Sequence, residues 1–234
     1  MKQKTTEQGA TTLQLTYDGF DVTVIRPEKP NGKWIWKTEF LYAFDDAERA
    51  LVALGYTRVY LRISNRYGSF GAIRLMHDFY HFIVKELDLD PKCILFGFSR
   101  GGLYAFNFAL FYPEYVDKIY LDAPVLDMRT WPPKGSRERD EVYREYDLTE
   151  ETLEHFSGHP IENLAEFFKK RIPLLLVAGG SDEVVPFAQN AGRMIEYCRE
   201  HQIEIASFVK SECRHHPHSL ADVSPIVQFV VGED

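Results

Sequence analysis

Ser99 is the residue of this sequence best suited to act as a nucleophile. It is the centre of residues 97–101, GFSRG, which match the pattern G-x-S-x-G. The apolar run 92–96 before it is typical of a buried strand, and the run 102–112 after it is typical of a buried helix that ends at Pro113. A serine on such a strand-to-helix turn exposes its hydroxyl above the sheet, where the helix N-terminus favours developing negative charge. The alternative is an ordinary glycine-serine turn.

A serine hydroxyl needs a base to accept its proton, and the base needs a third group to orient it. In folds with this kind of turn, the acid and then the histidine follow the serine along the chain. Asp182 follows the strongly apolar run 172–178, and His215 follows the last expected strand, 203–210. Parallel strands end at one edge of a sheet, so we expect Ser99, Asp182 and His215 to meet there as a catalytic triad.

Neighbouring residues compete for two of these roles. Asp122 and Asp127 follow an earlier strand and are alternative acids, while His216 and His218 are alternative bases. We favour His215 as the base because it is the first histidine after the last strand. Three histidines in four positions also suggest a metal ligand set, but His-His-Pro-His lacks helical spacing and no second ligand cluster is evident, so we expect no metal.

Stabilising the oxyanion of a tetrahedral intermediate requires preorganised N–H donors. The backbone N–H of Arg100, directly after the nucleophile, supplies one. We expect the second from the loop 65–69 that follows an expected strand at 58–63, and favour the N–H of Tyr67, with Gly68 permitting the turn. The alternative is that this loop is an ordinary glycine turn.

The elements that would position these residues follow an α/β pattern. A hairpin signal, Asp18-Gly19, joins two alternating segments near the N-terminus, and strands then alternate with helices. This order predicts a mostly parallel central sheet flanked by helices on both faces. The expected strands are 13–17, 20–25, 58–63, 93–96, 116–121, 172–178 and 203–210, and the expected helices are 40–54, 72–87, 102–112 and 188–201.

One segment interrupts the alternation. Residues 127–171 contain no convincing strand, and a structureless loop of that length is unusual in a compact domain. We expect a small helical lid over the carboxyl ends of the strands. The three tryptophans, Trp34, Trp36 and Trp131, fall in expected loops near the mouth of the site, where aromatic walls suit a sugar ring or an acyl group. Alternatively, they cover the edge of the core.

Composition narrows the class of protein. The 234 residues suit one domain, 1–234, and the formal net charge of −8 disfavours binding to nucleic acid or an anionic membrane. No run of 18 apolar residues predicts a membrane span, and residues 1–12 lack the apolar core of a signal peptide. Three widely spaced cysteines, Cys93, Cys198 and Cys213, indicate reduced thiols and a cytoplasmic location. The oligomeric state does not follow from the sequence.

From about Phe20 to Phe229 the chain resembles the α/β-hydrolase superfamily. More narrowly, it is similar to bacterial esterase-type members close to the prolyl-oligopeptidase-like branch. The residues that carry this resemblance are WIWKTEF at 34–40, NRYGS at 65–69, SRGGLY at 99–104, DAPV at 122–125 and HHPHS at 215–219. One departure is that the superfamily commonly has a glycine before the catalytic histidine, where this chain has Cys213-Arg214.

The resemblance implies a serine hydrolase without metal or organic cofactor. We expect a carboxylesterase that cleaves a small acyl ester, with an acylated sugar among the candidate substrates. A second interpretation is a prolyl-oligopeptidase-like peptidase restricted to short peptides, since the chain has no propeller or gating domain. A third is a non-catalytic receptor that uses the pocket of the same fold to bind a ligand.

Overall fold

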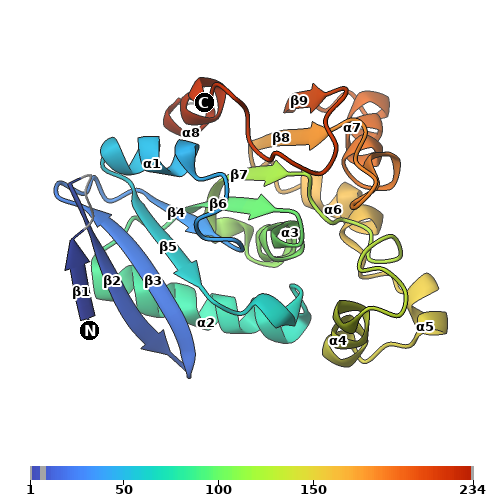
Figure 1. Cartoon of the computed structure of the whole chain (residues 1–234), viewed down its shortest axis with the longest axis horizontal. Helices are drawn as coiled ribbons and strands as arrows, with labels where there is room; N and C mark the ends of the chain where they lie inside the picture. The colour runs from blue at the N-terminus through green and yellow to red at the C-terminus, as the bar shows by residue number, and fades with distance from the viewer. Residues whose placement is uncertain (1, 6–8, 233–234) are drawn as a thin grey trace.

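The chain, described by a computed structural model over residues 2–5 and 9–232, is organised around a nine-stranded sheet (Figure 1). The strand order is β1-β2-β3-β5-β4-β6-β7-β8-β9. Pairing is antiparallel from β1 to β5 and parallel from β5 through β4 to β9. The strands are β1 (Lys2–Thr5), β2 (Ala10–Tyr17), β3 (Phe20–Pro27), β4 (Trp34–Lys37), β5 (Thr57–Leu61), β6 (Cys93–Phe98), β7 (Val116–Asp122), β8 (Leu174–Gly179) and β9 (Ala206–Lys210). The single domain predicted for residues 1–234 includes residues 1, 6–8, 233 and 234, which lie outside the described residues.

The predicted hairpin is confirmed in β2 and β3. Asp18 and Gly19 connect the strands with positive φ angles of 47° and 80°, the left-handed pair that a tight two-residue hairpin turn requires. From this hairpin the sheet continues into the parallel strands that carry the site.

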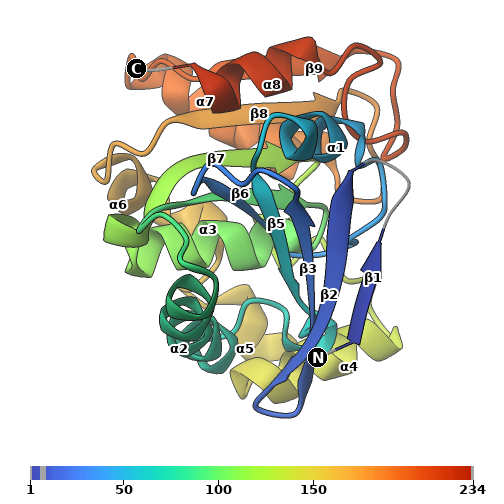
Figure 2. The same cartoon turned by 90° about the vertical axis from the view of Figure 1, so that its left-hand side faces the viewer.

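Helices cover both faces of the sheet, as predicted (Figures 1 and 2). Helices α1 (Asp46–Ala53) and α8 (Ser224–Val231) pack on one face, through residues such as Leu51 and Ile226. The other face carries α2 (Phe70–Leu87), α3 (Gly101–Phe111), α6 (Leu164–Phe168) and α7 (Ala191–Glu200). In the described part of the chain, no helix is long and apolar enough to cross a membrane.

The largest departure from the predicted fold is β4. Trp34 and Trp36 were expected in loops at the mouth of the site, but they lie in a central strand and are only 0% and 1% exposed. The indole Nε1–H of Trp34 donates to the carbonyl of Asp90 at 3.0 Å, and Trp36 packs against Phe79 and Phe108. A four-residue strand buried on both faces has no alternation of polar and apolar residues, so periodicity could not reveal it.

The helix predicted from Phe40 begins later, at Asp46. Phe40 and Phe44 both have positive φ, 56° and 50°, which a right-handed helix cannot accommodate. The residues between β4 and α1 therefore form a loop at the carboxyl end of the central strand.

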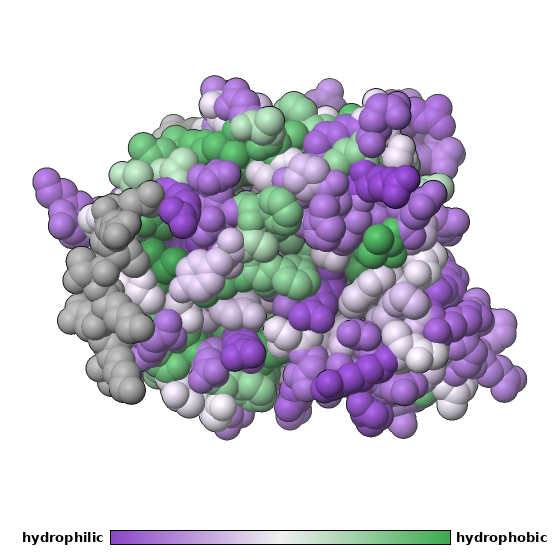
Figure 3. Space-filling view, viewed as in Figure 1, coloured by the Kyte–Doolittle hydropathy of each residue, from purple (hydrophilic) through white to green (hydrophobic). Residues whose placement is uncertain are grey.

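The chain between β7 and β8 is helical, without a strand among its residues, as the sequence predicted. It contains α4 (Arg137–Tyr146), α5 (Glu150–Glu154), a 3-10 turn (Pro160–Asn163) and α6. Helix α4 packs against the turn after β5, and in Figure 1 it lies with α5 beyond the carboxyl ends of the strands. Helix α6 returns to the sheet, where Phe167 stacks on Phe106 of α3. Figure 3 shows mainly hydrophilic side chains on the side of the molecule where α4 and α5 lie.

The buried position of Trp36 predicts a stability effect rather than an effect on substrate binding. Trp36→Ala should lower the free energy of unfolding by about 3–5 kcal/mol through the cavity it leaves, as measured by urea denaturation. Trp131→Ala is the matched control: Trp131 is half-buried in the segment between β7 and β8, so its loss should cost less stability. Unchanged stability in Trp36→Ala would contradict this assignment.

Candidate active site

Ser99 occupies a sharp turn between β6 and α3. Its φ of 49° lies in the left-handed region, which non-glycine residues rarely adopt. Three backbone hydrogen bonds hold it there: its N–H donates to Asp122, and its carbonyl accepts from Gly102 and Val125, all at 2.9 Å. The strained backbone is thus fixed by the neighbouring strand and by the helix that follows.

Two glycines allow the Ser99 turn to pack closely against the neighbouring elements. A Cβ added to Gly97 would lie 2.7 Å from the Cβ of Ala105, and one added to Gly102 would lie 2.5 Å from the Cβ of Pro124. Both distances are shorter than van der Waals contact permits. The two glycines therefore set the distance between β6, α3 and the end of β7.

His215 links Ser99 to Asp182. Its Nε2 lies 3.0 Å from the Ser99 Oγ, and its Nδ1 lies 2.7 Å from Oδ2 of Asp182. The other carboxylate oxygen of Asp182 accepts the N–H groups of Val184 and Val185 at 2.9 and 3.0 Å. Each of the three predicted triad residues is only 6% exposed. The structure therefore brings together the three residues that the sequence selected.

The loop before His215 is held close to the end of β8. Ser181 N–H donates to the carbonyl of Cys213 at 3.0 Å, and a Cβ at Gly179 would lie only 2.1 Å from the Arg214 carbonyl oxygen. This close approach thus requires a glycine at position 179, at the end of β8. The residues before His215 are Cys213 and Arg214, in place of the glycine that is common there in the superfamily.

The competing acids have other partners. Asp127 forms an ion pair with Arg129, with Nε 2.8 Å from Oδ1. Asp122 binds His218, whose Nδ1 lies 2.7 Å from its Oδ1, while its Oδ2 accepts the N–H of Ser219 at 2.7 Å and the hydroxyl of Tyr120. A second buried Asp–His pair therefore lies beside the first. Sequence reasoning named both residues but only as rivals for the triad.

The two predicted oxyanion donors lie on different loops. Arg100 directly follows Ser99 and precedes α3, so its N–H belongs to the positive end of that helix. Tyr67 follows β5 and is buried; its hydroxyl donates to Glu141 of α4, and its carbonyl accepts from the Tyr146 hydroxyl at 2.8 Å. The Tyr67 side chain thus connects the loop after β5 to α4.

Glu39 is a residue at this site that sequence reasoning missed. Its carboxylate is 1% exposed and accepts two hydrogen bonds at 3.2 Å from the Arg100 guanidinium. Burial raises the pKa of the Glu39 carboxyl, although Arg100 opposes this effect. Two cues point to Glu39: its place in the segment WIWKTEF at 34–40, and its position after β4, a strand that the sequence pattern did not reveal.

Of the three tryptophans predicted to contact substrate, only Trp131 lies on the side of the strand ends. Its ring is 6.2 Å from that of Tyr67, in an apolar cluster formed with α4 and α5. Trp34 and Trp36 belong to the core instead. Their predicted role in substrate binding is wrong because β4 removes them from the mouth of the site.

Comparison with known families fits this arrangement. A family model described as the alpha/beta hydrolase fold matches residues 42–153, which include the Ser99 turn. The chain has the α/β-hydrolase fold. A search of curated protein sequences found no match for this chain.

Solved structures with the same fold include both esterase and peptidase domains. The S-formylglutathione hydrolase of Agrobacterium tumefaciens aligns with a TM-score of 0.68 and 14% identity over 92% of each chain. The Pyrococcus horikoshii acylaminoacyl peptidase has a TM-score of 0.66 and 14% identity, covering 88% of this chain and 37% of that one. Porphyromonas gingivalis dipeptidyl peptidase 4 has a TM-score of 0.64 and 13% identity, covering 88% of this chain and 32% of that one. The chain spans about a third of the length of those peptidases.

A buried histidine connects two parts of the segment between β7 and β8 by hydrogen bonds. His159 is fully buried; its Nδ1 accepts the Met128 N–H at 3.3 Å, and its Nε2 donates to the Leu153 carbonyl at 2.9 Å. Burial lowers the pKa of His159. The folded protein thus holds this ring neutral between residues near the start of the segment and α5.

The lowered pKa of His159 predicts a loss of stability in acid. Once the pH is below 6.5, the ordinary pKa of histidine, this ring binds a proton in the unfolded chain. In the folded chain, the lowered pKa means that the ring binds a proton only at a lower pH. The free energy of unfolding should therefore fall as the pH drops below 6.5, until the lower folded pKa is passed. His159→Gln should reduce this slope in urea denaturation at a series of pH values. Identical slopes in the two proteins would contradict the assignment.

Proposed function

We propose that this α/β-hydrolase is a serine hydrolase that cleaves a small carboxylic ester through an acyl-enzyme. The observation that carries this proposal is the continuous hydrogen-bonded path from Ser99 through His215 to Asp182, built on a strained serine at a strand-to-helix turn. Such a path activates a hydroxyl that is otherwise a weak nucleophile.

Each group of the triad has a defined task in this mechanism. The Ser99 Oγ attacks the ester carbonyl carbon while His215 Nε2 accepts the hydroxyl proton, and Asp182 stabilises the imidazolium. When the tetrahedral intermediate collapses, the C–O bond to the alcohol breaks, and His215 returns the proton to the leaving oxygen. Water then attacks the acyl-Ser99 ester by the same steps, which releases the acid and restores the hydroxyl.

The oxyanion needs two N–H donors, and Arg100 supplies one. The sequence favoured Tyr67 for the other, but β4 lies between β5 and β6, so the loop after β4 is one strand nearer to Ser99. A Cβ at Gly101 would lie 3.4 Å from the Glu39 nitrogen. We therefore favour the N–H of Glu39 over that of Tyr67.

The neighbouring residues of this loop have other partners for their N–H groups. The N–H of Thr38 donates to the Phe96 carbonyl at 3.0 Å, and that of Phe40 bonds to the Glu39 carboxylate. Of the three residues that follow β4 directly, this leaves Glu39 as the one whose N–H can serve as a donor to the oxyanion. The ion pair between the Glu39 side chain and Arg100 then serves to hold the two backbone donors in position.

The residues near the site favour a small substrate. Helices α4 and α5 lie at the strand ends as a lid, and Trp131 and Tyr67 provide an aromatic surface suited to an acyl group or a sugar ring. The three cysteines are free thiols, which supports a reducing, cytoplasmic location. A small-molecule ester, with an acylated sugar as one candidate, is the proposed substrate.

A peptidase acting on short peptides is the second candidate function, supported by the fold shared with the two peptidases. Matched ester and anilide substrates with one acyl group separate the two. An esterase should turn over the ester far faster than the anilide, whereas comparable kcat/KM values would favour the peptidase. A receptor would turn over neither substrate.

Ser99→Ala tests the nucleophile. This variant should lose labelling by a fluorophosphonate probe, and its kcat for an ester should fall by about 10⁴–10⁶ with the fold intact. Ser181→Ala is the matched control, because Ser181 is an exposed serine near the triad acid and should keep both properties. Persisting activity in Ser99→Ala would exclude the serine mechanism.

The two Asp–His pairs give a matched test of the acid. Asp182→Asn should lower kcat by about 10⁴, because an amide favours the wrong tautomer of His215. Asp122→Asn alters an equally buried carboxylate on the neighbouring histidine and should lower kcat far less. Ester turnover of both variants, with circular dichroism as the control for folding, decides between them. A larger loss from Asp122→Asn would reassign the acid.

A further inference from the structure

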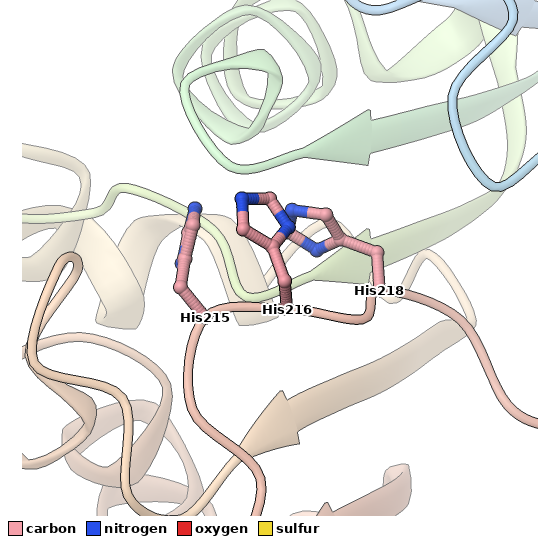
Figure 4. A group of neighbouring side chains, drawn as sticks. All are labelled: His215, His216 and His218. Carbon is pink, nitrogen blue, oxygen red and sulfur yellow. The ribbon is translucent and has the colours of Figure 1, made fainter.

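The imidazole rings of three histidines lie close together in the loop after β9. His215, His216 and His218 are all neighbours there, with every pair of ring centroids 4.9 Å apart (Figure 4). One ring nitrogen from each residue lies within 4.8 Å of those of the other two. His216 is exposed, whereas His215 and His218 are buried. The group is thus accessible from solvent on one side only.

Buried carboxylates orient two of these rings. Asp182 holds Nδ1 of His215, and Asp122 holds Nδ1 of His218, each at 2.7 Å. Both rings therefore keep Nε2 for another partner. A carboxylate behind a histidine in this way fixes the ring and strengthens it as a metal ligand.

The His-His-Pro-His segment lacks the helical spacing that many metal ligands have. Here a loop brings the rings together, so His-His-Pro-His spacing is no obstacle. Zinc binds imidazole nitrogen at about 2.0–2.1 Å, so tetrahedral ligand atoms lie about 3.4 Å apart. Because His216 is exposed, a change in its side-chain torsion angles can bring its nitrogen closer to the other two.

We propose that His215, His216 and His218 form a binding site for Zn²⁺ and that its occupancy switches off the Ser99 nucleophile. The Nε2 lone pair of His215 binds the metal instead of accepting the proton of Ser99, which stays on Oγ. No covalent bond breaks, and removal of the metal restores the base. The binding half of this proposal is independent of the proposed function, and the inhibitory half rests on it.

A second histidine pair must be removed before metal binding is measured. His77 and His81 are one turn apart on α2, with their Nε2 atoms 3.2 Å apart, and such a pair can itself bind a divalent metal. All measurements therefore use the full chain carrying His81→Gln, which leaves the loop histidines unchanged.

Binding is measured on metal-free protein with Co²⁺, by visible absorption, and with Zn²⁺, by calorimetry. The His81→Gln protein should bind one metal ion. Adding His216→Ala should weaken its affinity by more than the roughly 10–100-fold that losing a supporting carboxylate costs. Adding His201→Ala, an exposed histidine on the end of α7, is the matched control and should change nothing. Absence of binding, or equal affinity with and without His216, would overturn the site.

The inhibitory half is tested by the rate of fluorophosphonate labelling of Ser99. Zn²⁺ should slow labelling of the His81→Gln protein relative to its own metal-free rate, whereas the protein that also carries His216→Ala should keep its own metal-free rate when Zn²⁺ is added. Binding of Zn²⁺ without slower labelling would overturn the inhibition. Absence of labelling even without metal would overturn the proposed function and the inhibition with it, while Co²⁺ absorption would still decide the metal site.

Discussion

The backbone conformation of Ser99 is the constraint on which the site depends. A left-handed φ of 49° is unfavourable for serine, and it persists because hydrogen bonds to β7 and the following loop enforce it. Gly97 and Gly102 let α3 pack against β6 and the end of β7 closely enough to make those bonds. Without that packing, the Oγ would leave the reach of His215. Close packing in this part of the fold thus maintains the position of the Ser99 hydroxyl.

The parallel half of the sheet explains why residues distant in sequence meet. Ser99, Asp182 and His215 follow β6, β8 and β9, which end at one edge. The strand between them, β7, ends in Asp122, which holds His218 of the same loop as His215. One loop after β9 therefore carries the histidines of both Asp–His pairs. Because this loop holds His215, His216 and His218 close together, the proposed base is also one of the proposed metal ligands.

The parts of the fold that the sequence predicted are those with a strong local pattern. Ser99 lies in a recognisable turn, and Asp182 and His215 follow predicted strands in the required order. Strand β4 could not be recognised because its four residues are all buried, so neither Glu39 nor the core position of Trp36 followed from periodicity. The pairing of Asp122 with His218 depends on how the last loop folds back across the strand ends, a long-range contact that no local pattern encodes.

In the proposed mechanism, Ser99 carries the acyl group during turnover. The most direct test is to mix the protein with an ester whose acyl-enzyme hydrolyses slowly, quench in acid and analyse the peptides by mass spectrometry. The peptide containing Ser99 should gain the mass of the acyl group and lose it again on longer incubation. Turnover with no acylated peptide, or with the acyl group on another residue, would exclude Ser99 as the nucleophile.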